Sequence, residues 1–123
     1  MSTQQIDFTM LARTGLAPRM PKAGEVIFEE GQDGDRMYVV RHGEVEILRG
    51  DKVVETISGG GMFGEMALID GSKRSATARA KTECELVPVD EKTFVFLVHE
   101  TPYFALDVMR LLADRLRAMN ELI

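Results

Sequence analysis

The chain contains little of what several common kinds of site require. Its 123 residues include a single cysteine, Cys84, so no disulfide can form within the chain, and a reducing, cytoplasmic setting is expected. Only two histidines are present, His42 and His99, and they are far apart in the sequence. A histidine-rich metal site of the kind used for hydrolysis is therefore not predicted.

The sequence also has no long apolar run and no excess of basic residues. No apolar stretch approaches the roughly 18 residues that a membrane-spanning helix needs, so we expect no direct contact with a membrane. The first residues, MSTQQIDFTMLA, lack the basic start and the apolar core of a signal peptide. The 15 basic residues stand against 20 acidic ones, for a net charge of −5, which argues against nucleic acid as a partner.

Enough apolar sequence for one core is present, and glycines divide it into short runs. Apolar residues make up 45% of the chain, which favours a single domain spanning 1–123. The runs between the glycines are typical of strands, such as EVEIL at 44–48 and KVVETI at 52–57. Closely spaced strands predict a mainly β fold, an antiparallel β-roll or jelly roll over about 15–89. The expected strands cover 25–28, 36–41, 44–48, 52–57, 75–80 and 84–89.

From residue 90 onward the pattern is helical. Asp90 is a typical N-cap residue and predicts a helix that reaches about His99, and Pro102 at a first helical position predicts another. We therefore expect two α-helices over about 90–123, and a short N-terminal helix at Ile6–Ala12. An apolar stripe follows the last helix at spacings of three or four residues, at Phe104, Val108, Leu112, Leu116, Met119 and Ile123.

The stretch SGGGMFGEMALIDGSKRSATARA, residues 58–80, carries the most distinctive pattern. Gly59, Gly61 and Gly64 match the dinucleotide-binding pattern G-x-G-x-x-G. That fold needs a long crossover helix after the glycines, whereas the apolar run 63–69 soon meets a turn and returns to strand-like sequence. The phosphate loop of nucleoside triphosphatases fails too, because Arg74 stands where serine or threonine is required. The glycine triplet is therefore interpreted mainly as a turn.

A different anion site fits the same residues. A short helix that begins at Gly64 would leave its first backbone N–H groups unpaired, and these groups attract an anion together with the helix dipole. The chain then returns with Arg74, whose guanidinium can hold two phosphate oxygens, and with Ser75. Glu65 would repel a phosphate, but it could accept a hydrogen bond from a hydroxyl of the same ligand, such as that of a ribose. Each residue also has an ordinary interpretation, with Arg74 paired to Asp70 at the surface and Glu65 favoured by the helix dipole.

The segment FGEMALIDGSKRSAT, residues 63–77, resembles the phosphate-binding cassette of cyclic nucleotide-binding domains. This family includes regulatory subunits of protein kinase A, catabolite-activator-type transcription factors and cyclic nucleotide-gated channels. The resemblance extends upstream through GEVIF at 24–28, GQDGDRMYVV at 31–40 and GEV at 43–45, and downstream through the C-terminal helices. It implies an eight-stranded β-roll followed by helices, with a cyclic nucleotide as ligand and no metal or other cofactor.

By this resemblance, Glu65 accepts a hydrogen bond from the ribose 2′-hydroxyl and Arg74 pairs with the cyclic phosphate. Arg115, on the last helix, is expected to cap the base. Lys73 departs from the proline that many members carry before the arginine. Ser75 is intermediate between the residues that often track cyclic AMP or cyclic GMP, so we expect cyclic AMP, with cyclic GMP as an open alternative. The backbone N–H groups expected at the phosphate are those of Gly64, Met66, Ala67, Ser75 and Ala76.

The predicted function is that of a receptor or regulatory domain. We expect no enzymatic activity, because no nucleophile–base motif appears in the sequence. Ligand binding is expected to shift the C-terminal helices, whose changed apolar face would be recognised by a partner protein or a second copy of the chain. The alternative is a degenerate β-roll that acts without ligand as an interaction or dimerisation module through 104–123. Glu65 and Arg74 favour the receptor.

Overall fold

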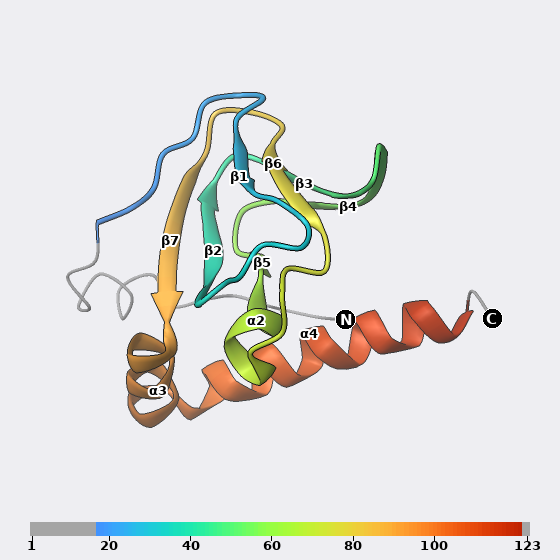
Figure 1. Ribbon diagram of the computed structural model, residues 1–123. Helices are drawn as coiled ribbons and strands as arrows, with labels where there is room; N and C mark the ends of the chain where they lie inside the picture. Colours follow the sequence, from blue (N-terminus) through green and yellow to red (C-terminus); the bar gives the residue numbers. More distant parts are fainter. Residues whose placement is uncertain (1–16, 122–123) are drawn as a thin grey trace.

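The computed structural model describes residues 17–121 and has an antiparallel β-roll followed by C-terminal helices (Figure 1). The predicted helix at 6–12 and the side chains of Met119 and Ile123 lie outside the described part. The predicted strands and C-terminal helices are confirmed, whereas the short strand β5 was not expected. The elements are β1 (Val26–Phe28), β2 (Arg36–His42), β3 (Val45–Arg49), β4 (Lys52–Ile57), β5 (Met62–Phe63), α2 (Glu65–Asp70), β6 (Thr77–Ala80), β7 (Glu85–Asp90), α3 (Glu91–Glu100) and α4 (Pro102–Glu121).

The strands form two antiparallel sheets that together make the roll. One sheet has the order β1-β6-β3-β4 and the other the order β5-β2-β7. The resemblance implied eight strands; residues 17–121 contain seven, and Arg19 adds an isolated antiparallel bridge to Leu86 of β7. Strand β4 lies at an edge of its sheet, and the β3–β4 hairpin extends away from the rest of the roll (Figure 1).

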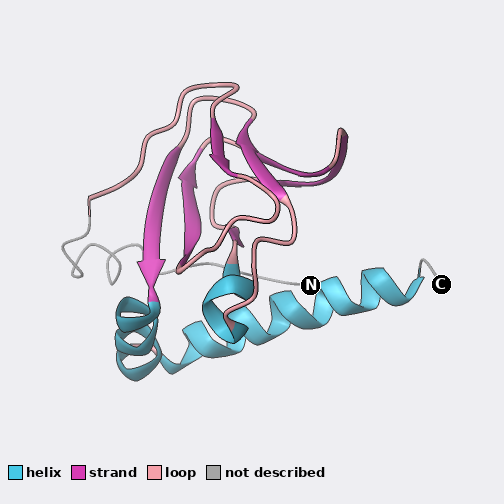
Figure 2. Ribbon diagram, in the orientation of Figure 1, coloured by secondary structure: helices cyan, strands magenta, loops and turns pink. Residues whose placement is uncertain are grey.

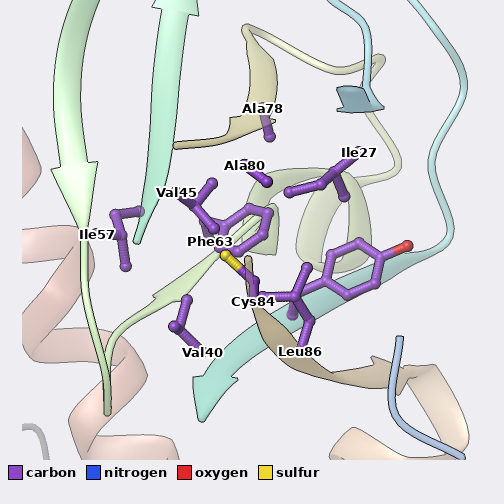
Figure 3. Packing of buried hydrophobic residues seen from close by; sticks show 10 residues of the cluster. Ile27, Val40, Val45, Ile57, Phe63, Ala78, Ala80, Cys84 and Leu86 are labelled. Atoms are coloured by element: carbon purple, nitrogen blue, oxygen red, sulfur yellow. The ribbon is translucent and has the colours of Figure 1, made fainter. Parts of the chain in front are cut away.

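Strand β2 separates two hydrophobic clusters. Because side chains alternate along a strand, Met37 and Val39 join one cluster while Tyr38 and Val40 join the other. The first cluster connects the roll to the helices through Leu97, Phe104, Val108 and Leu111. The second fills the interior of the roll (Figure 3), with Ile27, Val45, Ile57, Phe63, Ala78, Ala80, Cys84 and Leu86. The helices are thus attached through a core of their own.

Helix α3 begins where the sequence predicted. Oδ1 of Asp90 accepts a hydrogen bond from the backbone N–H of Thr93 at 2.8 Å, which is an N-cap. Hydrogen bonding to Thr93 holds the pKa of the Asp90 carboxyl below its usual value. Pro102 then begins α4, which passes along the end of the roll beneath α2 (Figure 2). No helix within residues 17–121 has the length and apolar character needed to cross a membrane.

Candidate functional site

The short helix α2 is bounded by two glycines. Gly64 precedes it with a φ of 82° and Gly71 follows it with a φ of 71°, a left-handed conformation that residues with a side chain rarely adopt. Within the described residues no side-chain hydrogen bond caps the start of α2, and the backbone N–H groups of its first turn have no partner inside the helix. The predicted short helix at Gly64 is therefore confirmed.

Arg74 is buried, and neutral groups orient it. The residue is 6% exposed. Its Nη1 donates to the carbonyl oxygen of Gly64 at 3.0 Å, and its Nη2 donates to that of Arg36 at 2.8 Å. The guanidinium also lies over the ring of Phe28, 3.9 Å from the ring centroid. Among the described residues, no carboxylate lies within ion-pair distance of Arg74.

The interpretation of Arg74 as a surface arginine paired with Asp70 is therefore wrong. Oδ1 of Asp70 instead accepts a hydrogen bond from the backbone N–H of Ser72 at 2.9 Å, and hydrogen bonding to Ser72 lowers the pKa of the Asp70 carboxyl. Burial lowers the pKa of the Arg74 guanidinium, because desolvation disfavours its charge. An arginine nevertheless stays charged at neutral pH. Among residues 17–121, Arg74 is thus a buried cation whose nearest carboxylates, those of Asp35 and Glu65, lie beyond ion-pair distance.

The backbone of Gly34 packs against the same guanidinium. A β-carbon added at Gly34 would lie 2.3 Å from Nε and 2.5 Å from Cζ of Arg74, which is far inside van der Waals contact. The φ of Gly34 is not in the left-handed region. A side chain at position 34 would therefore need the guanidinium of Arg74 to move, because the arginine occupies the volume that the side chain would fill.

Glu65 is also buried, and Arg115 of α4 holds it. The residue is 2% exposed, and Nη1 of Arg115 donates to Oε2 of its carboxylate in a very close ion pair. Nη2 of Arg115 donates to the carbonyl oxygen of Met62 at 3.2 Å. Nε of Arg115 lies 3.5 Å from Oε1 of Glu55 on β4. Arg115 thus ties α4 to the start of α2, and its predicted contact with a base stays a prediction.

The polar atoms left unsatisfied are concentrated in this region. Three buried side-chain nitrogen or oxygen atoms of the described residues have no hydrogen-bond partner: Oε1 of Glu65, Nε of Arg74 and Nε of Arg115. Leaving such an atom buried without a partner costs roughly 1–3 kcal/mol. All three atoms belong to residues of one region, which makes this region the candidate site for a ligand.

The other predicted residues surround Arg74 and Glu65 in the sequence. Met66 is exposed and Ala67 is buried in α2, and Ser75 is exposed and Ala76 is buried directly after Arg74. Their proposed contribution is a backbone N–H, which does not depend on how far the side chain is buried. Their contact with a phosphate is untested and stays a prediction.

A pocket of about 280 Å³ adjoins this site. Residues 55–62 and Leu111 of α4 line it, and two of the lining residues, Glu55 and Met62, contact Arg115. The glycine triplet forms part of its wall, with a φ of 88° at Gly60, and the predicted turn is confirmed.

Several residues of the site were not identified from the sequence. Gly34 and Phe28 lie in segments that already resembled the family's early strands, so their position was known but their contact with Arg74 was not. Glu55 lies in a strand that the sequence predicted only as a strand. Glu55 and Arg115 form an ion pair although they are 60 positions apart in the sequence, and no local pattern indicates such a contact.

Comparison with known proteins agrees with this architecture. The profile described as cyclic nucleotide-binding domain matches residues 19–101. A cyclic nucleotide-gated potassium channel of Rhizobium etli is 38% identical over 100 residues, which cover 81% of this chain and 28% of the channel. The chain therefore spans little more than a quarter of that relative.

Two solved structures have the same fold. The catabolite activator protein of Thermus thermophilus is 30% identical, with a TM-score of 0.82 over 92% of this chain and 55% of the activator. PfPKA-R with bound cAMP is 28% identical, with a TM-score of 0.78 over 95% of this chain and 41% of that protein. Both matches include the roll together with helices that follow it, as the coverage of this chain requires.

Proposed function

The chain belongs to the cyclic nucleotide-binding domain family, and we propose that it is a receptor that binds a 3′,5′-cyclic nucleotide at Arg74 and Glu65. Cyclic AMP is the first candidate ligand, and cyclic GMP is the alternative. The proposed unit is one domain over 1–123, with the roll over about 15–89 and the helices over about 90–123. The proposed setting is cytoplasmic, in keeping with the single cysteine.

The observation that carries this proposal is the cluster of unsatisfied atoms at Arg74 and Glu65. Arg74 is a buried cation with no carboxylate of the described residues in ion-pair distance, so a phosphate would supply a direct counter-charge at a site where the guanidinium is already oriented. Glu65 has one oxygen on Arg115 and the other, Oε1, buried without a partner. A ribose hydroxyl is the donor that Oε1 lacks.

Two features of the ligand follow from this pair of residues. The phosphate and the hydroxyl must lie close together in one small molecule, because Arg74 and Glu65 are close together. Arg74 donates a hydrogen bond to the carbonyl oxygen of Gly64, and Gly64 is the residue before Glu65. A cyclic nucleotide has this arrangement, with its ribose 2′-hydroxyl beside the cyclic phosphate. The similar structure PfPKA-R has cAMP bound, which supports the same class of ligand here.

We propose that the signal leaves the site through α4. Arg115 connects Glu65 to this helix, so a ligand that hydrogen-bonds to Glu65 acts on a carboxylate that already holds α4. Bound ligand would favour one arrangement of the helices in proportion to its difference in affinity for the two arrangements. A partner protein or a second copy would then recognise α4, whose exposed apolar residues include Tyr103, Leu106, Met109 and Leu116.

Calorimetric titration with cyclic AMP and with cyclic GMP tests the receptor. We expect heat and saturation with at least one of them. If neither nucleotide gives heat at high micromolar concentration, the chain is better described by the alternative, a β-roll that acts without ligand as an interaction module. The exposed apolar residues of α4 are the observation that favours this alternative.

A further inference from the structure

Glu55 lies at an irregular point of the edge strand β4. In the pairing of β3 with β4, Ile47 faces Glu55 and Leu48 faces Val53, so the register slips by one residue and Val54 is left without a partner. Such bulges bend a strand, change the direction of nearby side chains and occur frequently beside functional sites. This one immediately precedes Glu55.

The carboxylate of Glu55 is directed to the functional site but is not fixed there. Its Oε1 lies 3.5 Å from Nε of Arg115, and the side chain of Glu55 is 42% exposed. Nε of Arg115 has no hydrogen-bond partner, so this contact is an ion pair without a hydrogen bond. Glu55 also lines the pocket of about 280 Å³ beside Met62 and Leu111. It can therefore turn to a ligand without breaking a hydrogen bond to Arg115.

The charged groups of the site follow one another in the order of the parts of a nucleotide. Arg74 contacts Gly64, which precedes Glu65, and Glu65 contacts Arg115, which reaches Glu55. In a cyclic nucleotide the ribose stands between the phosphate and the base. With the phosphate at Arg74 and the ribose at Glu65, the base extends in the direction of Arg115 and Glu55.

We propose that Glu55 reads the edge of the base and favours guanine over adenine, an inference that rests on the proposed function. A carboxylate only accepts hydrogen bonds. Guanine offers it two adjacent donors, N1–H and the 2-amino group, which match the two carboxylate oxygens. Adenine offers a single amino group beside ring nitrogens whose lone pairs repel a carboxylate. Glu55 therefore raises the affinity for cyclic GMP relative to cyclic AMP, whichever of the two binds more tightly overall.

The test compares Glu55→Gln with the unaltered chain in titrations with cyclic GMP and cyclic AMP. The amide keeps the shape of the side chain but replaces one acceptor with a donor. We expect the Kd for cyclic GMP to rise about 5- to 10-fold, at the lower end of the effect of a bidentate contact to a base because Glu55 is partly exposed. The Kd for cyclic AMP should stay the same or fall, because the amide can accept from the amino group of adenine and donate to the neighbouring ring nitrogen.

Two controls make the result specific. Asp51→Asn, in the exposed turn of the same hairpin, removes an equal charge and should leave both Kd values unchanged. Cyclic inosine monophosphate has N1–H but no 2-amino group, so it should lose less affinity than cyclic GMP on Glu55→Gln.

The outcomes separate this inference from the proposed function. If the unaltered chain binds a nucleotide but Glu55→Gln changes both Kd values equally, or neither, Glu55 does not read the base and the inference is wrong. If the unaltered chain binds neither nucleotide, the proposed function is wrong and the inference falls with it.

Discussion

The backbone of Gly34 lies against the guanidinium of Arg74 so closely that a β-carbon there would be 2.3 Å from Nε. The same guanidinium donates to two carbonyl oxygens and lies over the ring of Phe28. Its orientation is therefore set by shape and by neutral hydrogen bonds. An acidic partner would have to be displaced by an incoming phosphate, whereas these contacts can remain when the phosphate binds.

Gly34→Ala should weaken nucleotide binding because the methyl group must displace the guanidinium of Arg74. We expect the Kd to rise at least about 10-fold, which corresponds to the loss of one charge-assisted hydrogen bond. Titration calorimetry measures the loss. Gly50→Ala, in the exposed turn of the β3–β4 hairpin, is the control, since its added β-carbon meets nothing within 4 Å and Gly50 lies outside the pocket. Equal affinities for the two variants would show that Arg74 adapts to the methyl group.

Arg74→Ala should weaken binding by about 1.5–3 kcal/mol, the range for hydrogen bonds to a charged group. The reason is that the proposed site has a single buried cation for the phosphate. Arg79→Ala, which removes an arginine paired with Glu46 on the sheet, is the control and should bind normally. An unchanged affinity in Arg74→Ala would mean that the phosphate binds elsewhere.

The role of Glu65 can be tested by removing the 2′-hydroxyl group of the ligand. The unaltered chain should bind 2′-deoxy cyclic AMP about 10-fold or more weakly than cyclic AMP, because Oε1 of Glu65 loses its donor. Glu65→Ala should bind both ligands with the same, lower affinity. Competition binding with the two ligands gives this double-mutant cycle. A full preference for the 2′-hydroxyl in Glu65→Ala would contradict the assignment.

Asp90→Ala should reduce the free energy of unfolding by about 1 kcal/mol at pH 7, the usual cost of losing an N-cap. The pKa of Asp90 is lowered in the folded chain, so its stabilisation is present above the unfolded pKa of about 3.9 and is lost as the pH falls through the folded value. Urea unfolding of both chains should therefore give a difference that shrinks below about pH 4. Asp51→Ala is the control, and a difference for Asp90→Ala that stays constant to pH 3 would argue against the cap.

The elements and the key pair of residues could be predicted because local patterns encode them. Alternating runs predicted the strands, Asp90 and Pro102 predicted the helix starts, and the spacing of Glu65 and Arg74 indicated an anion and a hydroxyl site. The strand β5 was missed because it has only two residues, between a glycine turn and a helix, and two residues are too few to show the alternation of side chains that marks a strand.

The contacts that complete the site could not be predicted in the same way. Arg115 forms an ion pair with Glu65, although the sequence suggested only that it contacts the base of the nucleotide. Its partner is 50 positions away, and the contact depends on how α4 packs across the end of the roll. The closeness of Gly34 to Arg74 likewise arises from the folding of one loop over another.

The two faces of β2 determine the order in which parts of the molecule can open. Met37 and Val39 are packed with the helices, while Tyr38 and Val40 are packed inside the roll. The helices can therefore separate and expose one face of β2 while its other face stays covered and its ladder to β7 stays intact. The amide protons of β2 should then exchange with deuterium only on global unfolding, while those of α4 exchange during smaller openings.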